Sequence, residues 1–71
     1  MTNEEVKKAY RNDTLVKIEG ENQKWFVASY YIQMDVTQSN TEMYVNLVEY
    51  TQSDNPQVRY NEQPNVLSIV I

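Results

Sequence analysis

The chain has 71 residues, a formal net charge of −4 at pH 7, one glycine, and neither cysteine nor histidine. This length accommodates a single domain, residues 1–71, with little depth for a pocket that excludes water. Without cysteine and histidine the chain has no disulfide, no thiolate nucleophile, no cysteine-containing zinc site, and no general base that titrates near pH 7. We therefore expect a binding protein without catalytic residues, metal or other cofactor.

Charge is distributed unevenly along the sequence. Residues 37–71 contain one cation, Arg59, and four acids: Glu42, Glu49, Asp54 and Glu62. Phosphate backbones are bound mainly by clustered Lys and Arg, so nucleic acid is a poor ligand and a basic protein is a better one. No apolar run approaches the ~20 residues that span a bilayer, and the lack of cysteine suits a reducing compartment. These features predict a cytoplasmic protein with no membrane contact.

The first element predicted is a short helix over about residues 3–11. Thr2 and Glu5 have the spacing of a capping box, in which each side chain accepts a hydrogen bond from the backbone of the other. A helix of this length is marginal in isolation. We expect it to dock on the rest of the domain through Val6 and Tyr10, which fall on one helical face.

From residue 14 to residue 71 the sequence is rich in β-branched and aromatic residues, which favour strands. The fold class predicted is mainly β (α+β): the helix followed by about five antiparallel strands, forming a bent sheet or a small SH3/Sm-like barrel. The strands are expected at Leu15–Glu19, Phe26–Val36, in the segment after Thr41, at Val58–Tyr60 and at Val66–Ile71.

Apolar residues alternate without interruption from Phe26 to Val36, which predicts one continuous apolar face. With a turn at residues 38–41, Ile32 is expected opposite Leu47, Met34 opposite Val45, and Val36 opposite Met43. A slip by one residue would place these side chains on opposite faces.

Four aromatic residues, Trp25, Tyr31, Tyr44 and Tyr50, are expected on the second face of this hairpin, with Tyr60 and Arg59 nearby. Three interpretations remain open. The aromatic side chains form part of the core of a closed barrel, they form a protein interface, or they stack on a planar small molecule such as a nucleotide base.

The helix and five strands, with a long second strand, resemble the Sm/Hfq-like family of small β-barrels. Residues 58–66 (VRYNEQPNV) are similar to the closing segment of that family, and residues 44–48 (YVNLV) to its third strand. The resemblance implies base contacts at Asn46 and Asn65 and ring assembly through strand pairing. It departs from the family at Gln63-Pro64, where an Arg-Gly or Lys-His pair is usual, and in lacking the glycine of the bent strand.

The last predicted strand is apolar to its end and has no charge or proline after Pro64. An unprotected edge of this kind favours pairing with another chain, so we expect a homo-oligomer through the C-terminal strand. The function predicted is a small acidic binding module that acts by stoichiometric protein contact, of the type that phages and mobile elements use as accessory or inhibitor proteins. The alternatives are an Sm-like oligomeric binder of RNA or single strands, and a sponge for a nucleotide.

Overall fold

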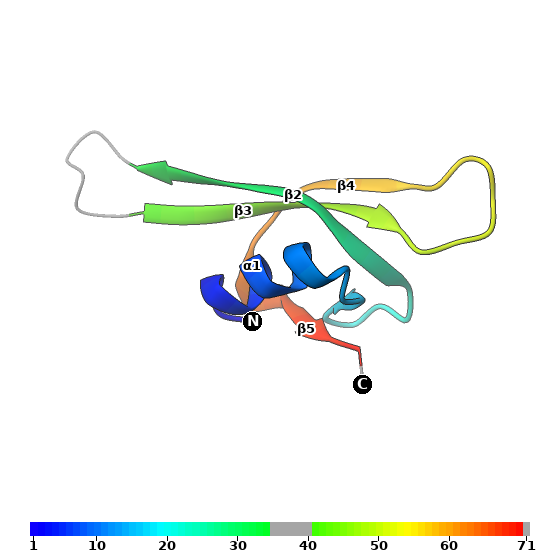
Figure 1. Cartoon of the computed structure of the whole chain (residues 1–71), viewed down its shortest axis with the longest axis horizontal. Coiled ribbons are helices and arrows are strands. Elements are labelled where there is room, and N and C mark those ends of the chain that lie inside the picture. The colour runs from blue at the N-terminus through cyan, green and yellow to red at the C-terminus, as the bar shows by residue number, and fades with distance from the viewer. Residues whose placement is uncertain (35–40, 71) are drawn as a thin grey trace.

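The computed structural model describes residues 1–34 and 41–70 and has one helix and one five-stranded antiparallel sheet (Figure 1). The strand order is β4-β3-β2-β1-β5, and among the described residues no pairing joins β4 to β5, so the sheet is open. This confirms the predicted fold class. The elements are α1 (Asn3–Asn12), β1 (Val16–Ile18), β2 (Lys24–Met34), β3 (Thr41–Glu49), β4 (Val58–Glu62), a 3₁₀ turn η1 (Pro64–Val66) and β5 (Leu67–Ile69).

The N-terminus of α1 has the capping box that the sequence predicts. Glu5 N–H donates to Thr2 Oγ1 at 3.1 Å, and Thr2 N–H donates to a Glu5 carboxylate oxygen at 2.8 Å. The predicted docking residues are partly wrong. Val6 and Ala9 are buried, whereas Tyr10 is 46% exposed and meets Tyr30 only edge to face, at 5.5 Å between ring centroids. The smaller side chains bring the helix backbone close to the sheet and leave the Tyr10 ring at the rim.

A β-bulge interrupts β2 and overturns the predicted alternation. Val27 pairs with Leu47 and Ser29 with Asn46, so Ala28 has no partner on β3. The extra residue reverses which side chains face the core. Trp25 and Val27 are buried before the bulge, and Tyr30 packs against the core after it.

The predicted register of the β2–β3 hairpin is also wrong. After the bulge, each residue of β2 pairs with a residue of β3 four positions earlier in the chain than predicted. Ile32 pairs with Met43 and Met34 with Thr41. A shift by an even number of residues changes the partners but leaves each side chain on its predicted face. Ile32 and Met43 therefore lie on one face, as predicted. The predicted turn at residues 38–41 lies largely outside the described residues.

The molecule is elongated, extending 44 × 24 × 24 Å, and its core lies to one side of the sheet, between the end of the β2–β3 hairpin and the β3–β4 loop. Figure 1 shows α1 on the inner side of the bent sheet, between the hairpin and the β1–β5 pair. Trp25, Leu47, Val6, Val16 and Val45 are the largest fully buried side chains. The β2–β3 hairpin extends beyond α1, and Ile32 and Met34 near its end are about half exposed (49% and 58%).

The two short strands at the other side of the core differ in length from the prediction. The first covers Val16–Ile18 instead of Leu15–Glu19, and the last covers Leu67–Ile69 instead of Val66–Ile71. The 3₁₀ turn that Pro64 begins takes Val66 out of the strand, because its N–H donates to the Gln63 carbonyl. Ile71 lies outside the described residues.

Candidate protein-binding face

The candidate site is the surface of β2, β3 and β4 that points away from α1 and the core, which we call the outer face. Strand alternation and the two bulges place on it the residues Lys24, Phe26, Ser29, Tyr31, Glu42, Tyr44, Asn46, Val48, Val58, Tyr60 and Asn61. Tyr60 is 70% exposed, Val58 44% and Tyr31 43%. This surface is therefore accessible, aromatic and largely uncharged.

Two tyrosines form a stacked pair in the part of the outer face nearest the hairpin end. Tyr31 and Tyr44 are direct cross-strand partners, with ring centroids 5.4 Å apart and an interplanar angle of 27°. The Tyr31 hydroxyl donates to Asn61 Oδ1 at 2.7 Å, and the Tyr44 hydroxyl donates to Glu42 Oε2 at 2.6 Å. Stacking and hydrogen bonding together hold both rings in one orientation.

The bond to Glu42 also affects the chemistry of Tyr44. Only the neutral phenol donates to the carboxylate, and the negative charge of Glu42 opposes formation of a phenolate beside it. Both effects raise the pKa of Tyr44 above its ordinary value. Tyr44 thus remains an uncharged hydrogen-bonding group throughout the neutral and mildly alkaline range.

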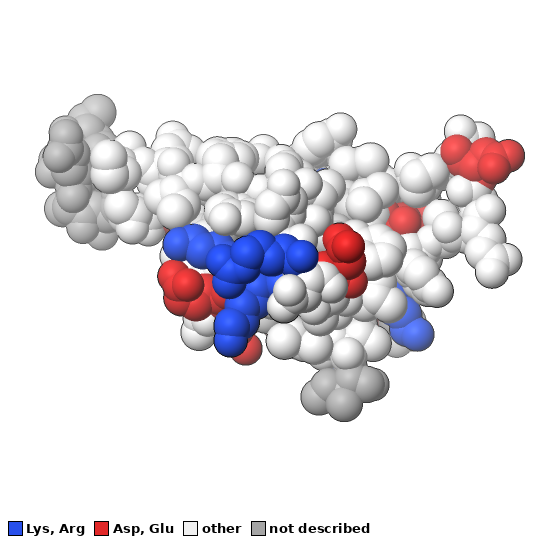
Figure 2. Space-filling model, in the orientation of Figure 1, with Lys and Arg blue, Asp and Glu red and all other residues white. Residues whose placement is uncertain are grey.

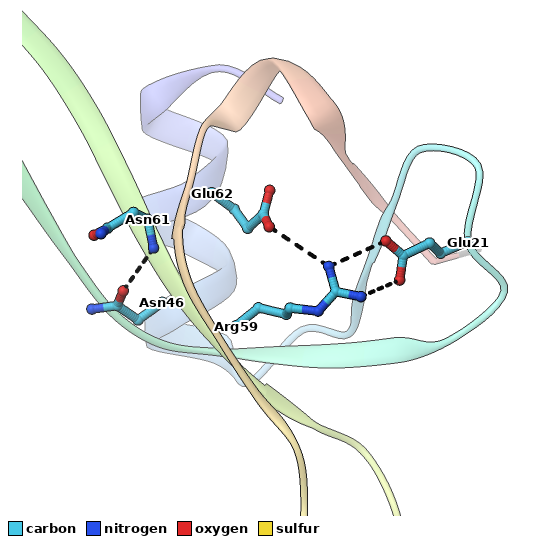
Figure 3. A network of polar contacts seen from close by, with 5 residues as sticks. All are labelled: Glu21, Asn46, Arg59, Asn61 and Glu62. Carbon is cyan, nitrogen blue, oxygen red and sulfur yellow. Dashed lines mark hydrogen bonds and ion pairs between the residues drawn. The ribbon is translucent and has the colours of Figure 1, made fainter.

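A polar network next to the stacked pair joins all three strands. Asn46 Nδ2 donates to Ser29 Oγ at 3.0 Å. Asn61 N–H donates to Asn46 Oδ1 at 3.1 Å, as Figure 3 shows. A second bulge occurs here, because β4 uses one residue more than β3 between the Val45 and Leu47 pairings. Asn61 has the left-handed φ of 61° in this bulge. Asn46 therefore lies between the bulges of both neighbouring strands, and its side chain accepts from the Asn61 N–H where the bulge in β4 disrupts the ladder.

Two of the predicted surface residues, Trp25 and Arg59, lie on the opposite side of the sheet. Trp25 is fully buried, so the core interpretation holds for it and its predicted place beside Tyr31 is wrong, because the bulge at Ala28 reverses the alternation between them. The Arg59 guanidinium lies over the Trp25 ring, 5.4 Å from its centroid. The indole Nε1 is buried without a hydrogen-bond partner among the described residues.

The Arg59 side chain forms its ion pairs with residues of the same chain. Its guanidinium forms a two-point contact with the Glu21 carboxylate, at 3.0 and 3.3 Å, and lies 3.8 Å from Glu62 (Figure 3). These contacts tie β4 to the turn between β1 and β2 across the open side of the sheet. Arg59 therefore links elements of the fold, and β4 presents no other cation.

The remaining predicted site residues lie apart. Tyr50, 56% exposed, packs edge to face on Phe26 at 5.6 Å, at the end of the outer face away from the stacked pair. Asn65 lies on η1 and lines an open pocket of about 610 Å³ with the β1–β2 turn and β5. Asn46 lines no part of that pocket, so the structure does not bring the two asparagines predicted to contact a base into one site.

Charged side chains gather away from the hairpin. Figure 2 shows Lys and Arg over α1 and acidic residues over the loop between β3 and β4, with most of the hairpin surface uncharged in this view. Within residues 1–34 and 41–70, no group of His, Cys, Asp or Glu has the arrangement of a metal site. No described helix has the length and apolar character needed to cross a bilayer.

Comparisons of this chain with protein-family models, with curated protein sequences and with solved structures found no significant match. The functional argument therefore depends on the geometry of the molecule itself.

Sequence reasoning missed Glu42 and Asn61 as members of the outer face, and it placed Phe26 on the opposite, continuous apolar face. The bulge at Asn61 could have been recognised in the sequence. Asn is among the few residues that tolerate a positive φ, and an Asn next to a predicted strand is a candidate bulge position. Glu42 lies two residues before Tyr44 on the same strand, so strand alternation alone places the two side chains on one face. Only the contact between Ser29 and Asn46 depends on the hairpin register, which the sequence pattern placed four residues away.

Proposed function

We propose that this protein is a non-enzymatic binding module that docks on another protein through the outer face of β2–β4. The observation that carries the proposal is the pair of an exposed Tyr31 and a half-buried Tyr44, whose rings are held by stacking and by bonds to Asn61 and Glu42. Tyrosines held in one conformation lose little side-chain entropy on binding and give a large contact area with a polar tip. Tyr60 and Val58 extend the same surface.

The charge of the outer face favours a protein over a nucleic acid. Among the described positions of this face, Lys24 is the one cation, at the end remote from the stacked pair, and Glu42 is an acid within the site. A phosphate backbone requires several clustered cations. A protein partner requires none, and the acidic C-terminal half favours a basic one.

Site-specific photocrosslinking tests this proposal. A photoreactive phenylalanine analogue replaces Tyr60 on the outer face, and in a matched control it replaces Lys8 on the exposed side of α1. We expect one adduct of defined mass in lysate of the source cells from position 60 and none from position 8. The Tyr31→Ala/Tyr44→Ala double variant, carrying the analogue at position 60, should lose that adduct while retaining its thermal unfolding transition. An adduct that persists in the double variant would refute the proposed face.

The second candidate function is an Sm-like oligomeric binder of RNA or single-stranded DNA. Its support is the proximity of Asn46 to a stacked aromatic pair, since bases stack on such pairs regardless of sequence. This function requires assembly and an affinity that falls with salt. Flat anisotropy titrations with U-rich and A-rich oligomers, together with a monomer mass in light scattering at micromolar concentration, would eliminate it.

A further inference from the structure

We propose that the free edge of β4 accepts an added β-strand from the partner protein, and that this strand is an extended segment carrying Lys or Arg. The inference rests on the proposed function and specifies how the partner binds. Three observations support it: the direction in which the backbone groups of β4 point, the bonds that already occupy the other edge of the sheet, and the charge of the residues around β4.

The hydrogen-bonding pattern between β3 and β4 shows which backbone groups of β4 point away from β3. Glu49 N–H donates to the Gln57 carbonyl, so this pair is a hydrogen-bonded one. In an antiparallel ladder hydrogen-bonded and non-hydrogen-bonded pairs alternate. Val58, opposite Val48, therefore directs its N–H and C=O groups away from β3, and Tyr60 has the same phase at the start of the bulge. Among the described residues no turn, loop or cap bond engages either backbone. Their side chains are 44% and 70% exposed.

The other edge of the sheet, on β5, is partly closed by the protein's own backbone. Leu67 N–H donates to the Pro64 carbonyl, and the Leu67 carbonyl accepts from the Met1 nitrogen at 2.8 Å. Only Ile69 of this strand, among the described residues, keeps both outward groups free. An added strand consequently finds more unpaired groups on β4 than on the C-terminal strand predicted to pair.

The charge around β4 defines the chemistry of the added strand. Residues 49–62 contain Glu49, Asp54 and Glu62 and one cation, Arg59. Arg59 points to the inner side, where Glu21 and Glu62 engage it. The edge therefore presents apolar side chains within an acidic rim, which complements alternating apolar and basic residues. A second copy of β4 would bring its own acidic rim against this one.

A displayed library of random peptides of about ten residues is the probe. Selection on the full chain should yield peptides that alternate apolar residues with Lys or Arg and that bind more weakly as salt increases. Val58→Pro removes one outward N–H and should weaken binding by about tenfold or more. Val58→Ala, which keeps the N–H, and Ile69→Pro, the same change at the other edge, should each stay within about twofold.

Amide hydrogen exchange of the unmodified protein gives an independent readout if Val58→Pro does not fold. The bound peptide should protect the amides of Val58 and Tyr60, which point away from β3 in the free chain. The inference is overturned if no peptide is selected, if those amides stay unprotected, or if the chain forms a dimer that Val58→Pro dissociates. Binding that is lost in Tyr31→Ala/Tyr44→Ala but kept in Val58→Pro would overturn the edge site and leave the outer-face function standing.

Discussion

At the scale of single residues, Asn61 combines two roles that usually fall to different residues. Its backbone adopts a φ of 61°, which side chains other than Gly, Asn and Asp adopt at a cost. Its side chain accepts from Tyr31, and its N–H donates to Asn46. One position thus shapes the bulge in β4 and orients a ring of the candidate site.

Substitutions at Asn61 should separate these two roles. Asn61→Gly keeps the left-handed backbone and removes the acceptor for Tyr31, so we expect a loss of about 1 kcal/mol or less in the free energy of unfolding. Asn61→Val also strains the backbone and should cost a further ~1–2 kcal/mol. Chemical denaturation measures both variants. Equal stability of the two would show that the positive φ is not retained in solution.

The pKa of Tyr44 leads to a prediction about alkaline pH. The folded-state pKa lies above the ordinary value of 10.0, because the neutral phenol donates to Glu42. The contribution of this bond to stability is therefore fully present below pH 10.0 and is lost as the pH rises through the folded pKa. NMR titration of the tyrosine ring carbons should show Tyr44 ionising at a lower pH in Glu42→Gln than in the unmodified chain. An unchanged midpoint would contradict the assigned cause.

At the scale of elements, the bulge at Ala28 decides which residues of β2 reach the surface. Before it, Trp25 and Val27 point inward, and after it, Tyr31 points outward. An uninterrupted strand would place Trp25 and Tyr31 on the same face, as the sequence pattern indicates. The bulge thus separates the core half of the strand from its binding half, and it supplies local twist where the sheet bends.

Deleting Ala28 should therefore disrupt the fold, although the side chain itself is exposed. Without the extra residue, either the inward residues Trp25 and Val27 or the outward residue Tyr31 must reverse. We expect the tryptophan emission to shift to longer wavelength and the cooperative unfolding transition to be lost or strongly lowered. Ala28→Ser keeps the residue count and is the control, with a change within about 0.5 kcal/mol. A deletion variant as stable as this control would contradict the importance of the bulge.

At the scale of the whole molecule, the core lies on the inner side of the sheet, and the end of the β2–β3 hairpin extends beyond it along the long axis. The buried cluster lies where α1 meets the bent sheet, and the end of the hairpin lies beyond it. A domain of this size has a stability of only ~3–5 kcal/mol. Most of it must come from the buried cluster that holds Trp25 and Leu47, which leaves the end of the hairpin open to substitution.

Two truncations should show this separation. Leu47→Ala removes a fully buried side chain and should cost ~2–5 kcal/mol, enough to unfold much of the protein at room temperature. Met34→Ala removes a side chain that is 58% exposed and should change stability by no more than ~0.5 kcal/mol. Thermal unfolding followed by circular dichroism compares the two. Similar losses would mean that the hairpin end packs on the core more closely than the structure shows.

The sequence by itself determined the features that depend on neighbouring residues. The capping box at Thr2 and Glu5 follows from side-chain chemistry three residues apart, and the fold class follows from local strand preference along residues 14–71. The aromatic character of the outer face was also predictable, because Tyr31 and Tyr44 were correctly assigned to one face of the hairpin.

Only the tertiary structure decided the features that depend on one extra residue or on pairing across the sheet. A bulge changes no local propensity, yet it reverses every side chain that follows, so Trp25 could not be assigned to the core from its spacing. The hairpin register was equally open, because an even shift preserves which side chains share a face. The contact between Arg59 and Glu21 joins segments that are 38 residues apart. Such a contact forms only once the bent sheet brings β4 and the β1–β2 turn together, and no local pattern encodes that geometry.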